Sequence, residues 1–187
     1  MIRTRELRYG QVSTVVRKVA SAALVFSAFQ FGSIALAQAA APNDSVALLF
    51  TGKFKTFSER LSLSYHGPVK KDQSVGGGLT QEAIQERNNT VRALYNKLLQ
   101  NDANFRLFVQ GIESKPELSR PFELNGKFDD SLELGVSVMQ AFFSASKFPG
   151  KEKLGATTFI SAEFDVLTAK ALCHYVTSAK GRTCVEN

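Results

Sequence analysis

Apolar residues recur at steps of three or four along most of the chain beyond residue 43, and this spacing predicts helices. The pattern is strongest in residues 159–180. Apolar residues cover one face of this segment and small or apolar residues cover the opposite face: Ile160, Phe164, Leu167, Ala171 and Tyr175, then Val166, Ala169 and Cys173. A helix that is apolar almost all round is usually buried. We therefore predict an all-α fold, a compact bundle of four to five helices around this buried C-terminal helix.

Both ends of the C-terminal segment carry residues typical of helix boundaries. Ser161 or Thr158 can cap its N-terminus, and acidic residues follow in the first turns, where the helix dipole favours them. Lys180 and Gly181 mark the other end, because glycine readily takes the left-handed conformation that ends a helix.

Four further segments are expected to be helical: residues 43–60, 80–100, 102–113 and 130–147. Asp102 can cap the third of these, and the pair Asp130 and Glu133 resembles a capping box for the fourth. The first is the least regular, because Gly52 weakens a helix by about 1 kcal/mol relative to alanine. Leu61, Leu63 and Tyr65 then alternate as in a short strand, so we expect that helix to end near Arg60.

The segment 80–100 is amphipathic. Its apolar stripe is Ile84, Val91, Leu94, Tyr95 and Leu98, and the residues expected to face water are Gln81, Gln85, Asn89, Arg92 and Asn96. Glu82 and Glu86 lie one turn apart and could serve acid–base chemistry, but a solvated helix face is the more common role of such a pair.

A glycine-rich loop, residues 66–78, precedes this helix. Gly76-Gly77-Gly78 could cradle a phosphate at the helix N-terminus. The Lys-Ser/Thr of a P-loop is missing and no clear strand precedes the glycines, so we interpret the loop as a flexible connection.

The first 37 residues match a secretory signal peptide. A basic stretch is followed by an apolar run from Val19 to Ala37, and small residues at the exit allow cleavage after Ala37 or Ala39. The run is also near the length that can span a bilayer, so an uncleaved anchor is the alternative. We expect cleavage, a single domain over residues 38–187 without a membrane span, and a periplasmic or secreted location.

Removal of the leader changes the charge of the chain. The full chain has 23 basic and 17 acidic residues, and the leader holds five and one of these, so 18 and 16 remain. The net charge of the mature part is therefore +2. Such a balance gives no reason to expect a nucleic-acid partner.

The two cysteines are spaced so that they can meet. A short return from the end of the last helix brings Cys184 back beside Cys173. In an oxidising compartment the thiols would form a disulfide, which contributes about 3 kcal/mol in the chain-entropy model. The cysteines, His66 and His174 could supply zinc ligands by type. Cys173 and His174 point about 100° apart on a helix, so we expect no metal and no cofactor.

Glu113-Ser114 and the later segment Gly135-Val136-Ser137-Val138-Met139-Gln140 resemble two motifs of the lytic transglycosylases. That resemblance implies a helical, lysozyme-like, peptidoglycan-cleaving enzyme with Glu113 as general acid. The chain has Ser-Val-Met where the family has Gly-Leu-Met, and two prolines interrupt the interval between the motifs. A few residues carry the resemblance, so we do not assign the chain to the family.

The sequence favours an exported non-enzymatic binding protein of the inhibitor, immunity or secretion-accessory type, whose partner is another protein. Twelve phenylalanines follow the leader. They could fill a helical core or line a cavity for a small apolar ligand, and a carrier of such a ligand is a further alternative. The peptidoglycan-active enzyme is the third hypothesis.

Overall fold

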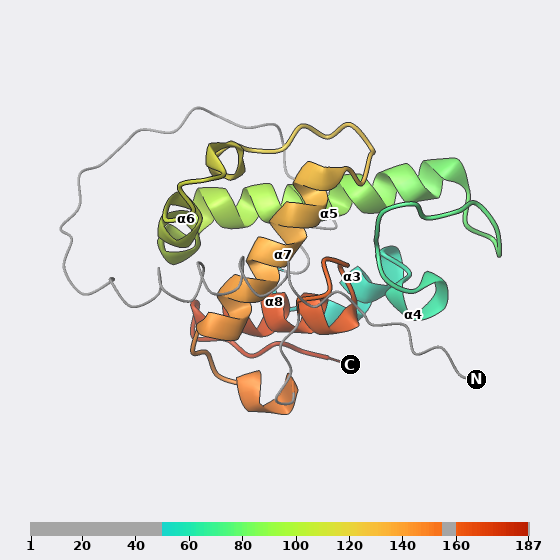
Figure 1. Ribbon diagram of the computed structural model, residues 1–187. Helices are drawn as coiled ribbons and strands as arrows, with labels where there is room; N and C mark the ends of the chain where they lie inside the picture. The colour runs from blue at the N-terminus through green and yellow to red at the C-terminus, as the bar shows by residue number, and fades with distance from the viewer. Residues whose placement is uncertain (1–49, 155–159, 187) are drawn as a thin grey trace, which may run out of the picture. The chain divides into compact units, whose positions relative to one another are not determined.

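The computed structural model describes residues 50–154 and 160–186, which fold as α-helices joined by long connections (Figure 1). The helices are α3 (Phe54–Arg60), α4 (Leu63–His66), α5 (Gln81–Asn101), α6 (Ala103–Gln110), α7 (Asp130–Ala145) and α8 (Val166–Ser178), with 3-10 turns η1 (Pro116–Ser119) and η2 (Lys151–Leu154). The described residues contain three isolated β-bridges and no strand. The all-α prediction is confirmed. The predicted signal peptide and residues 43–49 of the first predicted helix lie outside the described residues.

Helix α7 joins the two ends of the bundle. It packs against α5 and α6 on one side and against α8 on the other, and α8 also contacts α3 and η2. Figure 1 shows α7 crossing between the long helix α5 and the C-terminal helix α8. This arrangement encloses α8, and its residues from Ala171 to Thr177 are all buried. The predicted buried C-terminal helix is therefore confirmed.

Aromatic rings fill the interior between these helices. Phe142 of α7 contacts the rings of Phe105, Phe108 and Tyr175, and Phe105 contacts Tyr95. All the ring centroids in these pairs lie between 5.1 and 5.5 Å apart in edge-to-face geometry, which aromatic pairs favour. Phe105, Phe108 and Phe142 thus pack against one another in the interior.

The C-terminal helix begins later than its apolar pattern predicted. It starts at Val166, and its cap is Asp165, whose carboxylate accepts from the Thr168 N–H at 2.7 Å. Phe164 is fully buried but belongs to the preceding segment, where it exchanges two backbone hydrogen bonds with Val69. Leu167, expected on the buried face, is 37% exposed. The apolar spacing in the sequence therefore includes a buried residue that precedes the helix.

A buried glutamine of α7 holds the turn that leads into α8. Gln140 is 1% exposed, and its Oε1 accepts from the backbone N–H groups of Ser161 and Ala162 at 3.1 and 3.2 Å. Its Nε2 donates to the Glu163 carbonyl at 2.9 Å. Ala162 has a φ of 60°, a left-handed conformation that costs energy in a residue other than glycine. The Gln140 amide stabilises this turn, and the cap of α8 is Asp165 instead of Ser161, whereas Thr158 lies outside the described residues.

The first predicted helix is interrupted at Gly52, which has a φ of 90°. A side chain there would crowd Thr177 of α8 and the Thr183 carbonyl. Lys53 then pairs with Val185 in an isolated bridge, and α3 begins at Phe54. The end at Arg60 agrees with the sequence, whereas residues 63–66, which alternated as in a strand, form the helical turn α4.

The polar face of α5 faces water at Gln81 and Gln85, as predicted, but is buried at Arg92 and partly covered at Asn96. Arg92 is 2% exposed, and it donates to the carbonyls of Lys127 and Glu123 and to the Asp129 carboxylate. Asn96 pairs with the backbone of Phe122 through both its oxygen and its nitrogen. These side chains hold the connection between η1 and α7.

The cap of α7 lies one residue earlier than predicted. Asp129, not Asp130, accepts from the Leu132 N–H at 3.0 Å. Burial alone would raise the pKa of Asp129. The hydrogen bonds from Leu132 and Arg92 outweigh this effect and lower the pKa of Asp129 below its ordinary value. The predicted cap of α6 is confirmed, because the Asp102 carboxylate accepts from the Phe105 N–H.

Candidate functional site

A polar cavity of about 220 Å³ lies between the N-terminal half of α5 and the segment around α4. We call it the Arg87 cavity. It is lined by Arg60, Leu61, Ser62, His66, Gly78, Leu79, Ala83, Glu86, Arg87 and Thr90. A second hollow of about 420 Å³ lies beside α3 and the C-terminal segment, and Phe54, Ser58 and Glu186 contribute to it.

Three features of the local sequence shape the Arg87 cavity. Thr80 caps α5 by accepting from the Ala83 N–H at 3.2 Å, which fixes where the helix begins. Ala83, Arg87 and Thr90 then lie at helical spacing on the face toward the cavity. The glycine loop turns tightly, with backbone hydrogen bonds between Gly76 and Leu79 in both directions, and brings its last residues to the cavity edge.

The Arg87 guanidinium is buried beside this cavity and is 3% exposed. Its Nε donates to the Leu61 carbonyl at 2.8 Å and its Nη2 to the Gly67 carbonyl at 2.6 Å. Its Nη1 is buried and has no hydrogen-bond partner among the described residues. Burial lowers the pKa of Arg87, because a charged group loses hydration inside the protein. Arg87 therefore holds α4 and the following loop on α5 but leaves donors unused.

Arg92 provides a direct comparison on the same helix. It is equally buried, but a carboxylate lies against it, with Nη2 to Asp129 Oδ2 at 2.7 Å. Its other donors meet the carbonyls of Glu123 and Lys127. Arg92 thus has a counter-ion and a structural role, whereas Arg87 is hydrogen-bonded only to two neutral carbonyls within the described residues.

The surface at the cavity edge presents an aromatic side chain. Tyr65 of α4 is 87% exposed, and its ring meets that of His66 edge-on at 5.4 Å. Val75 of the following loop is 60% exposed, and Gln73 ties that loop back to the His66 and Pro68 carbonyls. We call Tyr65 and His66 the Tyr65 face. His66 belongs to this face and also lines the cavity.

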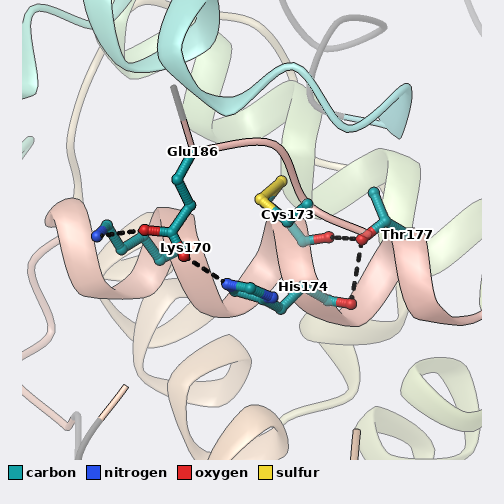
Figure 2. Close-up of a disulfide and its surroundings, with 6 residues drawn as sticks. Lys170, Cys173, His174, Thr177 and Glu186 are labelled. Carbon is teal, nitrogen blue, oxygen red and sulfur yellow. Dashed lines mark hydrogen bonds and ion pairs between the residues drawn. A yellow bond between two sulfur atoms is a disulfide. The ribbon is translucent and has the colours of Figure 1, made fainter. Parts of the chain in front are cut away.

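The two cysteines form the predicted disulfide, with Cα atoms 5.6 Å apart. Figure 2 shows the C-terminal segment beside α8, with Glu186 between Lys170 and His174. The Glu186 carboxylate pairs with Lys170 Nζ at 2.8 Å and with His174 Nε2 at 2.9 Å. The disulfide and these two contacts together hold the end of the chain on α8.

His174 is enclosed on its other side. A Cβ at Gly150 would collide with its Nδ1, so this ring nitrogen lies against backbone. Cys173 and Cys184, which could have bound a metal ion together with His174, are joined in the disulfide. Within residues 50–154 and 160–186, no group of three or more histidine, cysteine or acidic side chains could hold a metal ion.

Glu113, the residue that the transglycosylase resemblance suggested, is exposed on the turn after α6 and lines neither of the two cavities. Met139 and Gln140 of the second motif are buried in α7. Gln140 uses its amide to hold the turn before α8. The two motif segments therefore have separate surroundings.

Arg87 was missed at the sequence level, although a signal was present. It lies three residues after Ile84 and four before Val91, in phase with the apolar stripe of α5. A charged residue in an apolar phase indicates a buried charge, which needs partners.

Comparisons with protein-family models, with curated proteins and with solved structures found no match. None of the helices that the structure describes combines the length and the apolar character needed to cross a bilayer. The function is therefore argued from the geometry of the chain itself.

Replacement of Glu186 by glutamine should flatten the acid dependence of stability. Hydrogen bonds from Lys170 and His174 lower the pKa of Glu186. Its stabilising effect is therefore present above the unfolded-state pKa of about 4.5 and is lost as pH falls through the lower folded-state value. Because Glu186 is partly exposed, we expect a difference below about 1 kcal/mol.

Urea unfolding of wild type and Glu186→Gln between about pH 3 and 7 measures this difference. Glu152→Gln is the control, because Glu152 is exposed on η2. An acid dependence in Glu186→Gln equal to that of wild type would contradict the assignment.

Proposed function

We propose that this chain is an exported, non-enzymatic binding protein that recognises another protein through the Tyr65 face. The observation that carries the proposal is the 87% exposure of Tyr65 beside a polar cavity. An aromatic ring presented to water on a folded domain is favourable to bury against a partner. Tyrosine is among the residues that contribute most to protein interfaces.

The support beneath Tyr65 favours recognition with little rearrangement. Arg87 fixes the carbonyls on both sides of α4, those of Leu61 and Gly67. Gln73 attaches the glycine loop to the same region. A rigid face loses less entropy on binding than a flexible one, which favours affinity.

Export is supported by two independent features. The N-terminal pattern is typical of a cleavable leader, and the mature part contains the Cys173–Cys184 disulfide. Disulfides persist mainly in oxidising compartments such as the periplasm or the extracellular space. These features support a periplasmic or secreted protein that meets its partner outside the cytoplasm.

The Tyr65 face should determine which protein is captured. Wild type, Tyr65→Ala and the control Leu124→Ala are immobilised, and a cell-envelope extract of the source organism is passed over each. Leu124 is 53% exposed and lies on the loop before α7. We expect one stoichiometric partner on wild type and on Leu124→Ala, and loss of at least about tenfold in affinity for Tyr65→Ala, since hot-spot residues contribute about 2 kcal/mol or more. Retention of the partner by Tyr65→Ala, or an empty wild-type column, would refute the proposal.

Export should affect the measured mass of the protein in two ways, through cleavage of the leader and through oxidation of the two thiols. After expression with its own leader, we expect cleavage behind Ala37 or Ala39 and two thiols that resist alkylation until a reductant is added. Intact-mass spectrometry with and without reductant measures both. An uncleaved chain, or two thiols alkylated in the native protein, would contradict export to an oxidising compartment.

A further inference from the structure

Arg87 differs from the other buried arginine of α5 in a way that points to a ligand. A buried charge is normally neutralised by a charged partner. Arg92 has the Asp129 carboxylate at 2.7 Å, whereas within the described residues Arg87 hydrogen-bonds only to the carbonyls of Leu61 and Gly67. Buried unpartnered side-chain atoms in the described part of the chain also occur on Gln73, Asn88 and Ser144, and only that of Arg87 belongs to a charged group.

We propose that the Arg87 cavity binds a carboxylate group, which pairs with the unused donors of the Arg87 guanidinium. The inference goes beyond the proposed function, since the cavity shares only His66 with the Tyr65 face. The carboxylate belongs either to a free small organic acid or to the end of a peptide chain.

The number of unused donors fits a carboxylate. A guanidinium has five N–H groups, and Arg87 uses one on Nε and one on Nη2. Three remain, two of them on Nη1. The edge between Nη1 and Nη2 can therefore present two parallel N–H groups, an arrangement that matches the two oxygens of a carboxylate. The two carbonyl contacts already hold the guanidinium in place.

The size and lining of the cavity limit the chemical group to which the carboxylate can be attached. A volume of about 220 Å³ is below that of sites for drug-sized ligands. Leu61, Leu79 and Ala83 provide apolar walls, and the two leucines are 1% and 5% exposed. The cavity therefore suits a carboxylate with a short apolar group better than a bare phosphate ion.

The charges at the cavity favour an anion. Arg60 and Arg87 both line it, against one acidic side chain, Glu86. Arg60 and Glu86 are both exposed, so water screens the effects of their opposite charges on an anion, while the buried Arg87 guanidinium acts in a less polar environment. His66 adds an imidazole that can donate a further hydrogen bond.

The direct test is titration of the exported, isotope-labelled protein with propionate, followed by NMR. We expect saturable shifts at Gly78, Ala83 and the Arg87 side chain, with a Kd on the order of 1 mM for an acid of about five non-hydrogen atoms. Propionamide has the same shape without the charge, and it should leave these resonances unchanged. Equal binding of propionamide, or no saturation about a hundredfold above that Kd, would overturn the proposal.

Two variants separate ligand binding from the structural role of Arg87. Ala83→Leu fills the cavity on a helix that accepts leucine and leaves the Arg87 hydrogen bonds intact. It should stay folded and lose the propionate shifts. Arg87→Lys keeps the charge but loses the parallel donors, so binding should weaken at least about tenfold. Unchanged binding by Ala83→Leu would sink the idea even if Arg87→Lys fails to fold.

A dipeptide and its C-terminal amide distinguish the two sources of the carboxylate. Tighter binding of the dipeptide than of propionate, abolished by amidation, assigns the site to a chain end. Binding of propionate alone assigns it to a free acid, and both results support the proposal. Preference for inorganic phosphate over either carboxylate contradicts it. Because the titration uses no protein partner, failure of partner capture at Tyr65 leaves its result unaffected.

Discussion

The structure depends on buried polar side chains of the helices that hydrogen-bond to the backbone of the connections. The connections before α5, α7 and α8 are long, and their peptide groups need partners wherever they leave water. Arg92 and Asn96 of α5 supply them for the connection before α7, and Gln140 of α7 supplies them for the turn before α8. Arg87 does the same for the segments on both sides of α4. Aromatic packing fills the core, but these groups decide where each connection lies.

The same interaction, a buried polar side chain hydrogen-bonded to the backbone of a connection, also forms the candidate site. An arginine that holds a loop through two carbonyls keeps its charge and some of its donors. Where the chain supplies a carboxylate, as Asp129 does for Arg92, the result is a structural ion pair. At Arg87 the same side chain borders a cavity. Under the proposal, loop anchoring and ligand recognition share one residue, because the guanidinium that holds the segments on both sides of α4 also lines the cavity.

The sequence predicted features that depend on local periodicity and chain reach. The all-α class, the buried C-terminal helix, the Asp102 cap and the Cys173–Cys184 disulfide all follow from spacing along the chain. The predicted helix boundaries were less accurate where tertiary contacts compete with the local sequence pattern. Phe164 continues the apolar phase of α8, yet its backbone pairs with Val69, so the helix starts after it.

The candidate site could be predicted only in part. Arg92 and Asn96 were assigned to a solvated face because their positions on the helix are polar, and nothing local reveals that a connection from residues 122–129 covers them. Arg87 lies in the apolar phase of α5, a signal that could have been used. The cavity beside Arg87, and the lack of a carboxylate partner for it among the residues that the structure describes, arise from packing between segments distant in sequence, which periodicity does not contain.

A crystal structure of the exported protein grown with propionate would show directly whether the Arg87 cavity binds a carboxylate. We expect a carboxylate in the Arg87 cavity with both oxygens within hydrogen-bond distance of Nη1 and Nη2, and with the bonds to Leu61 and Gly67 retained. A carboxylate of the protein itself paired with Arg87, or a cavity that contains only water at saturating propionate, would contradict this expectation. In that case Arg87 would be a loop anchor alone, as Arg92 is.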